Sequence, residues 1–123
     1  MKIKLILPVL LALTLLLIAS CKKNEDINNG LSLEKLNGYV QKGPFLSGTS
    51  VTLYELSESL VATGKNFPSQ ISDNKGTFEV KNVDLASEYV LLKADGFYFN
   101  EVANESSAAQ LTLYALSDLK NKT

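Results

Sequence analysis

The sequence predicts a small all-β protein, an antiparallel β-sandwich of about seven strands that follows a cleaved signal peptide. From position 38 onward, apolar and polar residues alternate over short runs, which is the period of a half-buried strand. Gly, Pro, Asn and Asp separate these runs, as they do in turns. Residues 21–123 are enough for one small domain.

The first 20 residues have the parts of a secretory signal peptide. A short basic start (MKIK) precedes an apolar run over 5–19, and small residues close the run. This run is shorter than the roughly 20 apolar residues that span a bilayer. Cys21 follows directly and is the single cysteine of the chain, so an intrachain disulfide is excluded.

The segment LIASC (17–21) resembles the lipobox of bacterial lipoproteins. In that family the cysteine receives a diacylglyceryl group, the leader is cut before it, and the new amino group is acylated. The resemblance implies that Cys21 is the lipid-attachment residue and that membrane lipid is a partner, with the protein anchored in the cell envelope at the outer membrane. Two or more acyl chains anchor a protein stably, whereas one is marginal. An ordinary signal peptide and an uncleaved N-terminal helix remain as alternatives.

Residues 22–30 (KKNEDINNG) are polar and typical of a flexible tether. The acids after the two lysines resemble the surface-export signal of Bacteroidetes lipoproteins, which implies exposure on the cell surface. Residues 31–36 fit either a short turn or an extra edge strand. The predicted organisation is a signal peptide (1–20), a lipidated cysteine with its tether (21–36), a sandwich domain (37–119) and a tail (120–123).

Alternation and turn residues divide the sandwich region into strands and loops. The predicted strands are 38–42, 49–56, 69–72, 77–83, 87–94, 97–102 and 110–116. Loops are expected at 57–68 and 103–108. The segment DNKG (73–76) suits a type I turn followed by a left-handed Gly.

The inward positions of these strands define a predicted core. It consists of Val40, Val51, Leu53, Ile71, Phe78, Val80, Tyr89, Leu91, Phe97, Phe99, Leu111 and Leu113. Each large apolar side chain contributes roughly 1.5–3 kcal/mol when it is buried. A dozen of them can offset the ordering entropy of a domain of this size.

Several motifs together resemble the prealbumin-like, Ig-like β-sandwich modules of the carboxypeptidase regulatory-like and Cna-B-type families. They are GPFLSGTSVTL (43–53), DNKGTF (73–78) and YVL (89–91) before DGFY (95–98). The phrase QKGPFLSGTSVTLYEL also resembles the N-terminal module of Bacteroidetes surface lipoproteins. The resemblance implies a spacer, stalk or adhesion unit without catalysis. In some such modules a Lys–Asn isopeptide bond forms, for which Lys42 is the early candidate.

Composition excludes most catalytic machinery. The chain has no His, no Arg and no Trp, so a Ser-His-Asp triad, the usual zinc site and a bidentate phosphate clamp are excluded. Beyond residue 20, ten lysines face 13 acids, which argues against a nucleic-acid partner. We therefore expect no enzyme activity, no catalytic residue, no metal site and no cofactor.

Three weaker motifs are better explained by structure than by chemistry. The segment TGK (63–65) lacks the Gly and the Ser or Thr of a phosphate loop, and we interpret it as a turn. A lysine interrupts DNKG, so this segment does not match a calcium loop. Six glutamates could in principle supply a carboxylate pair for glycoside cleavage, but spacing does not show that any two meet in a cleft, and we interpret them as residues of solvated strand faces and loops: Glu55, Glu58, Glu79, Glu88, Glu101 and Glu105.

Tyrosines on the strand faces opposite the core are the candidate binding residues. Tyr39, Tyr54, Tyr98 and Tyr114 occupy such positions, and exposed aromatic rings stack on sugars or anchor protein contacts. Tyr54 and Tyr98 are the predicted site residues. The alternative is that these rings pack beneath loops.

The sequence thus favours a lipid-anchored adhesion, scaffold or spacer module with envelope proteins as partners. A glycan-binding accessory lipoprotein with a polysaccharide partner is an alternative. A further alternative is the N-terminal fragment of a longer surface lipoprotein.

Overall fold

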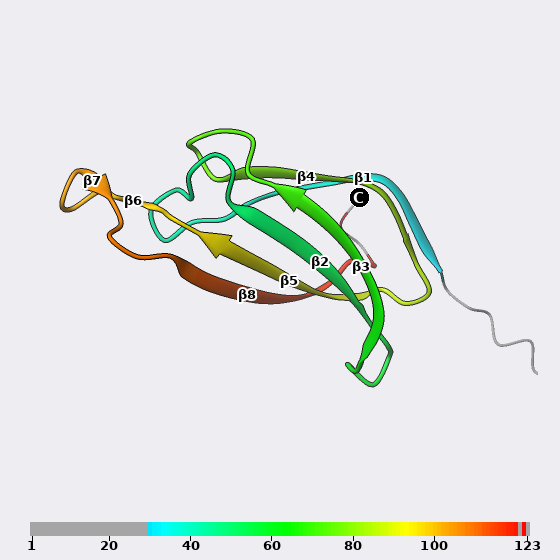
Figure 1. The fold of residues 1–123 in the computed structure, drawn as a ribbon. Coiled ribbons are helices and arrows are strands. Elements are labelled where there is room, and N and C mark those ends of the chain that lie inside the picture. The colour runs from blue at the N-terminus through cyan, green and yellow to red at the C-terminus, as the bar shows by residue number, and fades with distance from the viewer. Residues whose placement is uncertain (1–29, 121, 123) are drawn as a thin grey trace, which may run out of the picture.

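The computed structural model describes residues 30–120 and 122. These residues form an all-β fold in which every strand pair is antiparallel, and no helix occurs among them (Figure 1). The strands are β1 (Leu31–Tyr39), β2 (Ser50–Leu56), β3 (Ala62–Gln70), β4 (Thr77–Leu85), β5 (Tyr89–Gly96), β6 (Phe99–Asn100), β7 (Glu105–Ser106) and β8 (Leu111–Asp118). The predicted fold class is confirmed.

Two sheets form the layers of the sandwich. The larger sheet has the strand order β3-β2-β5-β8, and the smaller sheet pairs β1 with β4. The short β6–β7 hairpin projects from one end (Figure 1). Because the smaller sheet has only two strands, it leaves part of the larger sheet uncovered.

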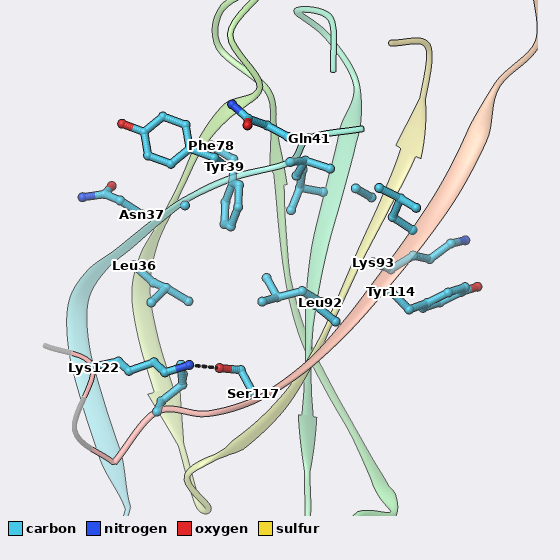
Figure 2. Close-up of a pocket in the computed structure, with 17 residues that line it drawn as sticks. Leu36, Asn37, Tyr39, Gln41, Phe78, Leu92, Lys93, Tyr114, Ser117 and Lys122 are labelled. Carbon is cyan, nitrogen blue, oxygen red and sulfur yellow. Dashed lines mark hydrogen bonds between the residues drawn. The ribbon is translucent and has the colours of Figure 1, made fainter. Parts of the chain in front are cut away.

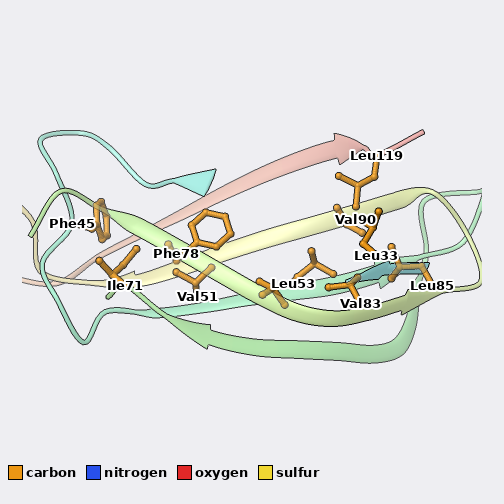
Figure 3. Packing of buried hydrophobic residues seen from close by; sticks show 12 residues of the cluster. Leu33, Phe45, Val51, Leu53, Ile71, Phe78, Val83, Leu85, Val90 and Leu119 are labelled. Carbon is orange, nitrogen blue, oxygen red and sulfur yellow. The ribbon is translucent and has the colours of Figure 1, made fainter. Parts of the chain in front are cut away.

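The core lies between the two layers and is contributed by both (Figure 3). Strict alternation in β2 points Val51 and Leu53 inward, where their side chains are at most 1% exposed. The buried cluster consists of Leu33, Phe45, Val51, Leu53, Ile71, Phe78, Val80, Val83, Leu85, Val90, Ala94 and Leu119. Five of these were predicted: Val51, Leu53, Ile71, Phe78 and Val80.

The predicted phase of β5 is wrong. Tyr89 and Leu91 were expected in the core, but Val90 and Ala94 are buried and Leu92 packs against the core. Pairing with β2 sets this phase, since Leu53 lies opposite Leu92. Because Leu91 and Leu92 are adjacent in the sequence, alternation alone is consistent with either of them facing the core.

Two other core predictions also fail near the β6–β7 hairpin. Phe97 is 41% exposed, and Phe99 is only half-buried in β6. The predicted strand 97–102 shrinks to two residues, and these pair with β7, which lies inside the predicted loop 103–108. Phe45, from the segment between predicted strands, fills the core instead and is 0% exposed.

The predicted loop at 57–68 is largely strand β3. This strand pairs with β2 on one side only and exposes most of its side chains. Phe67 is the one apolar side chain of β3 that packs against the core. The strand therefore depends mainly on backbone pairing, which leaves little apolar alternation in its sequence. Gly64, with a φ of 92°, and Pro68 further obscure the pattern, and both are tolerated at a sheet edge.

Residues 31–36 belong to β1, so the edge-strand alternative is confirmed and the sandwich begins at Leu31 rather than at 37. Leu33 and Leu36 both contact the core although they are three positions apart. The ladder is interrupted between them, where Asn82 of β4 has a φ of 52°. This interruption breaks the alternation by which a strand is normally detected.

The turn between β3 and β4 forms where DNKG predicted it. The Asp73 carboxylate accepts hydrogen bonds from the backbone N–H groups of Lys75 (2.9 Å) and Thr77 (3.0 Å). These bonds, that of Thr77 above all, lower the pKa of Asp73 below its ordinary value. Gly76 has a φ of 79°, and a Cβ there would collide with the carbonyl of Val40, so the turn requires glycine.

The two long sides of the sandwich differ. On the β3–β4 side the sheets are joined, because Ile71 forms a β-bridge with Phe78 and the Ser69 hydroxyl donates to the Glu79 carbonyl. On the β1–β8 side a groove of about 470 Å³ separates the strands (Figure 2). We call it the edge groove, and its apolar lining includes Leu36, Val51, Phe78, Leu92 and Leu113.

Candidate functional site

Tyr54 lies on the solvent-facing side of the four-stranded sheet. It is directly opposite Asn66 of β3 and Leu91 of β5, and Leu91 is in turn opposite Leu116 of β8. Side chains opposite one another on one sheet face have Cβ atoms about 4.5–5.5 Å apart. Tyr54, Leu91 and Leu116 therefore form a continuous apolar row across three strands.

A second row runs beside the first, from Thr52 through Lys93 to Tyr114. Figure 2 shows Lys93 and Tyr114 pointing away from the edge groove, toward solvent. Tyr114 is 63% and Leu116 58% exposed, while Tyr54 and Leu91 are half-buried. We call these two rows the outer face, and its members are Thr52, Tyr54, Leu91, Lys93, Tyr114 and Leu116.

A polar margin borders the outer face on the side toward β6. Lys93 and Asp95 form an ion pair at 3.9 Å, and the Thr112 hydroxyl donates to Asp95 at 3.1 Å. A shallow hollow lies here, lined by Ser50, Thr52, Tyr54, Lys93, Asp95 and Gln110. An apolar centre with polar groups at its margin is the usual layout of a protein-binding surface.

The structure does not bring the second predicted site residue, Tyr98, to this face. Its half-buried ring packs at 6.1 Å from the ring of Phe45, and the Lys42 ammonium lies 5.2 Å from its centroid. Tyr98 therefore packs against the core beside Phe45 and not on the outer face. Tyr39 is 72% exposed at the end of β1, away from both rows.

Sequence reasoning placed Tyr114 opposite the core but missed Leu91 and Leu116 as members of the outer face. Leu91 was assigned to the core, and the correct β5 phase could have identified it. Leu116 is separated from Tyr114 by one residue on an alternating strand, which is the signal that both share a face.

Three of the six carboxylate candidates, Glu55, Glu79 and Glu88, have side-chain partners, and Glu88 pairs with Lys120 at 3.5 Å. Glu55 is 3% exposed, and its side chain accepts hydrogen bonds from the Thr63 hydroxyl and the Ala86 N–H, each at 2.6 Å. Glu79 pairs with Lys81 at 3.2 Å and with Lys35 at 3.4 Å. These two lysines, Lys81 more strongly, lower the pKa of Glu79. Neither contact places two carboxylates around a common cleft.

The segment TGK, predicted as a turn, lies within β3 instead. Thr63 bonds to Glu55, and the Lys65 ammonium lies 3.6 Å from Asp84. Among residues 30–120 and 122, no group of three metal-binding side chains comes together. The same residues include no helix with the length and hydropathy needed to cross a bilayer. Cys21 lies outside the described residues.

No protein-family model, curated protein or solved structure matches this chain. The site is therefore interpreted from its own geometry.

Proposed function

We propose that this protein is a lipid-anchored, non-catalytic module of the bacterial cell envelope whose outer face binds another envelope protein. The observation that carries the proposal is the apolar row of Tyr54, Leu91 and Leu116 on the solvent side of a sheet. On a half-solvated antiparallel sheet the outward positions are normally polar. Three neighbouring apolar side chains there are typical of an interaction surface.

The anchoring part of the proposal rests on the sequence LIASC (17–21) and on the polar segment that follows it. Acyl chains on Cys21 would hold the domain at the membrane, with residues 22–30 as spacer. The resemblance to prealbumin-like modules of surface proteins supports the same assignment. Outer-membrane location and cell-surface exposure belong to this proposal.

The mass of the intact protein, extracted from membranes with detergent, tests the anchor. The expected mass is that of residues 21–123 plus about three acyl chains, and a Cys21→Ser variant should lose the lipid and leave the membrane fraction. An unmodified mass would contradict the anchor. A much larger lipidated species would instead favour the alternative of a longer lipoprotein.

The binding part is tested with paired variants in intact cells. We expect Leu116→Lys to abolish a specific cross-link to one envelope protein, because a charge in an apolar interface is costly to desolvate. Ala103→Lys, in the exposed loop before β7, is the matched control and should leave the cross-link intact. Equal cross-linking of both variants and the unmodified protein would contradict a role for the outer face.

Glycan binding is the second candidate because the hollow beside Tyr54 combines an aromatic ring with Thr52, Asp95 and Gln110. Aromatic stacking with polar partners suits a sugar ring. Under this alternative, Tyr54→Ala abolishes retention on a polysaccharide panel while Leu116→Lys has little effect. The two variants therefore distinguish the two candidates.

A further inference from the structure

The edge groove is the space that one more strand would fill. β1 is paired only with β4, and β8 only with β5, among the described residues. The two strands lie on opposite sides of the groove, as Figure 2 shows. Neighbouring strands in a sheet are about 4.7–4.9 Å apart, so a strand added to β1 would extend the smaller sheet over the uncovered part of the larger one.

The lining of the groove is apolar and only partly covered. Leu36 of β1, Leu92 of β5 and Leu113 of β8 pack against the core but remain half-exposed. Figure 2 shows Leu36 and Leu92 directed into the space between the sheets. Alternate apolar side chains of an added strand would bury these three leucines, which favours occupation.

The free edge of β1 indicates that the occupant is a polypeptide. A strand edge presents a row of unpaired N–H and C=O groups that pair with an incoming extended chain. An acyl chain would cover the apolar lining but leave this row unpaired. Residues 36–39, the C-terminal half of β1, line the groove, so an added strand would pair with this part of β1.

The charges around the groove indicate the chemistry of that strand. No Asp or Glu lines it, and its charged lining residues are Lys93 and Lys122. Lys93 points away from the groove, whereas the Lys122 ammonium lies on the groove side, 2.9 Å from the Ser117 hydroxyl (Figure 2). A carboxylate beside Lys122 would be complementary to it.

We propose that the edge groove binds an extended strand of a partner protein, one with alternating apolar side chains and a carboxylate near its end, which pairs with β1. This inference is independent of the outer face, which lies on the opposite side of the larger sheet. Its test therefore does not depend on the proposed function.

A labelled peptide of alternating Thr and Val that ends in Asp (TVTVTVD) serves as the probe, added to the purified full chain. Fluorescence anisotropy should show binding at least tenfold tighter than for two control peptides. One control has the same composition without alternation (TTTVVVD), and the other ends in an amidated Lys in place of Asp. Binding should also slow amide hydrogen exchange in residues 36–39.

Ala115→Arg is the blocking variant. Ala115 is opposite Leu92 in the register, lines the groove and is exposed, so the arginine fills the groove without entering the core. It should weaken peptide binding at least tenfold, while Thr112→Arg, on the other face of β8, should not. Ser117→Tyr is a second blocking variant if Ala115→Arg lowers the melting temperature.

Three results would overturn the proposal. Equal binding of the alternating and non-alternating peptides would show that no strand pairing occurs. Dimerisation of the chain that Ala115→Arg abolishes would identify a second copy as the occupant. A fatty acid that co-purifies with the protein and is not displaced by the peptide would identify a lipid.

Discussion

The two long sides of the sandwich are built differently, although the same two sheets contribute to both. On the β3–β4 side, the consecutive strands are connected by the turn at residues 73–76, which the Asp73 carboxylate stabilises. The Ile71–Phe78 bridge and the hydrogen bond from the Ser69 hydroxyl to the Glu79 carbonyl join the two sheets there. On the β1–β8 side, the first and last strands of the described chain face one another across the edge groove. Strands that are consecutive in the sequence join the two sheets along one side. Strands that are distant in the sequence leave the other side open, with room for one more strand.

The burial of two leucines illustrates the difference between the two sides. Leu53 of β2 is 0% exposed in the closed part of the core, while Leu113 of β8 lines the edge groove and is only partly buried. Both side chains are apolar and identical, so any difference in their contribution to stability reflects the side of the sandwich on which they lie.

The largest expected effect comes from Leu53→Ala, which should lower the free energy of unfolding by about 2–5 kcal/mol through lost burial and a cavity. Leu113→Ala should cost only about 1 kcal/mol, because its side chain is already partly exposed in the folded protein. Urea denaturation of the two variants checks this. Equal losses would mean that the groove side is as closed as the other.

Glu55→Ala tests the buried hydrogen bonds that the Glu55 carboxylate accepts at the end of β2. The Thr63 hydroxyl and the Ala86 N–H would lose their acceptor, which should cost about 1–3 kcal/mol of unfolding free energy. Glu58→Ala, an exposed neighbour, is the matched control and should be nearly neutral. The role of Glu55 is disproved if both variants unfold at the same urea concentration.

The smallest expected effect concerns the pH dependence of the β3–β4 turn. Since the pKa of Asp73 is lowered in the folded state, its contribution is present above the ordinary value of 3.8 and is lost as the pH falls through the folded pKa. Asp73→Asn should therefore reduce the stability loss between about pH 4 and pH 2. Urea midpoints across this range provide the measurement, and parallel curves for both proteins would contradict it.

The sequence was sufficient for the fold class and for β2, because Val51 and Leu53 alternate strictly with polar residues. The sequence was insufficient wherever pairing with a neighbouring strand determines which side chains are buried. Leu91 and Leu92 are equally apolar, and only the register with β2 turns Leu92 inward. Phe45 lies outside any regular strand, so no period marks it as core.

The outer face was predictable only in part. Tyr54 and Tyr114 could be placed opposite the core from alternation, whereas their neighbour Leu91 depends on the correct β5 phase. Tyr98 follows the end of β5 at Gly96, where the chain leaves the four-stranded sheet, so alternation no longer determines its direction. The edge groove had no sequence signal, because it arises from the unequal widths of two sheets.

The pairing of β1 with β4 has a consequence for how this chain folds. Tyr39 pairs with Thr77 and Leu31 with Leu85, so β1 has no sheet partner until the chain beyond β3 is present. A hairpin such as β2–β3 forms within microseconds, but distant pairing must first overcome the entropy of closing a long loop. During folding, the apolar positions of β1 therefore stay uncovered until β4 pairs with it. Docking of β1 is expected to be a late folding step, and one at which the chain is open to aggregation.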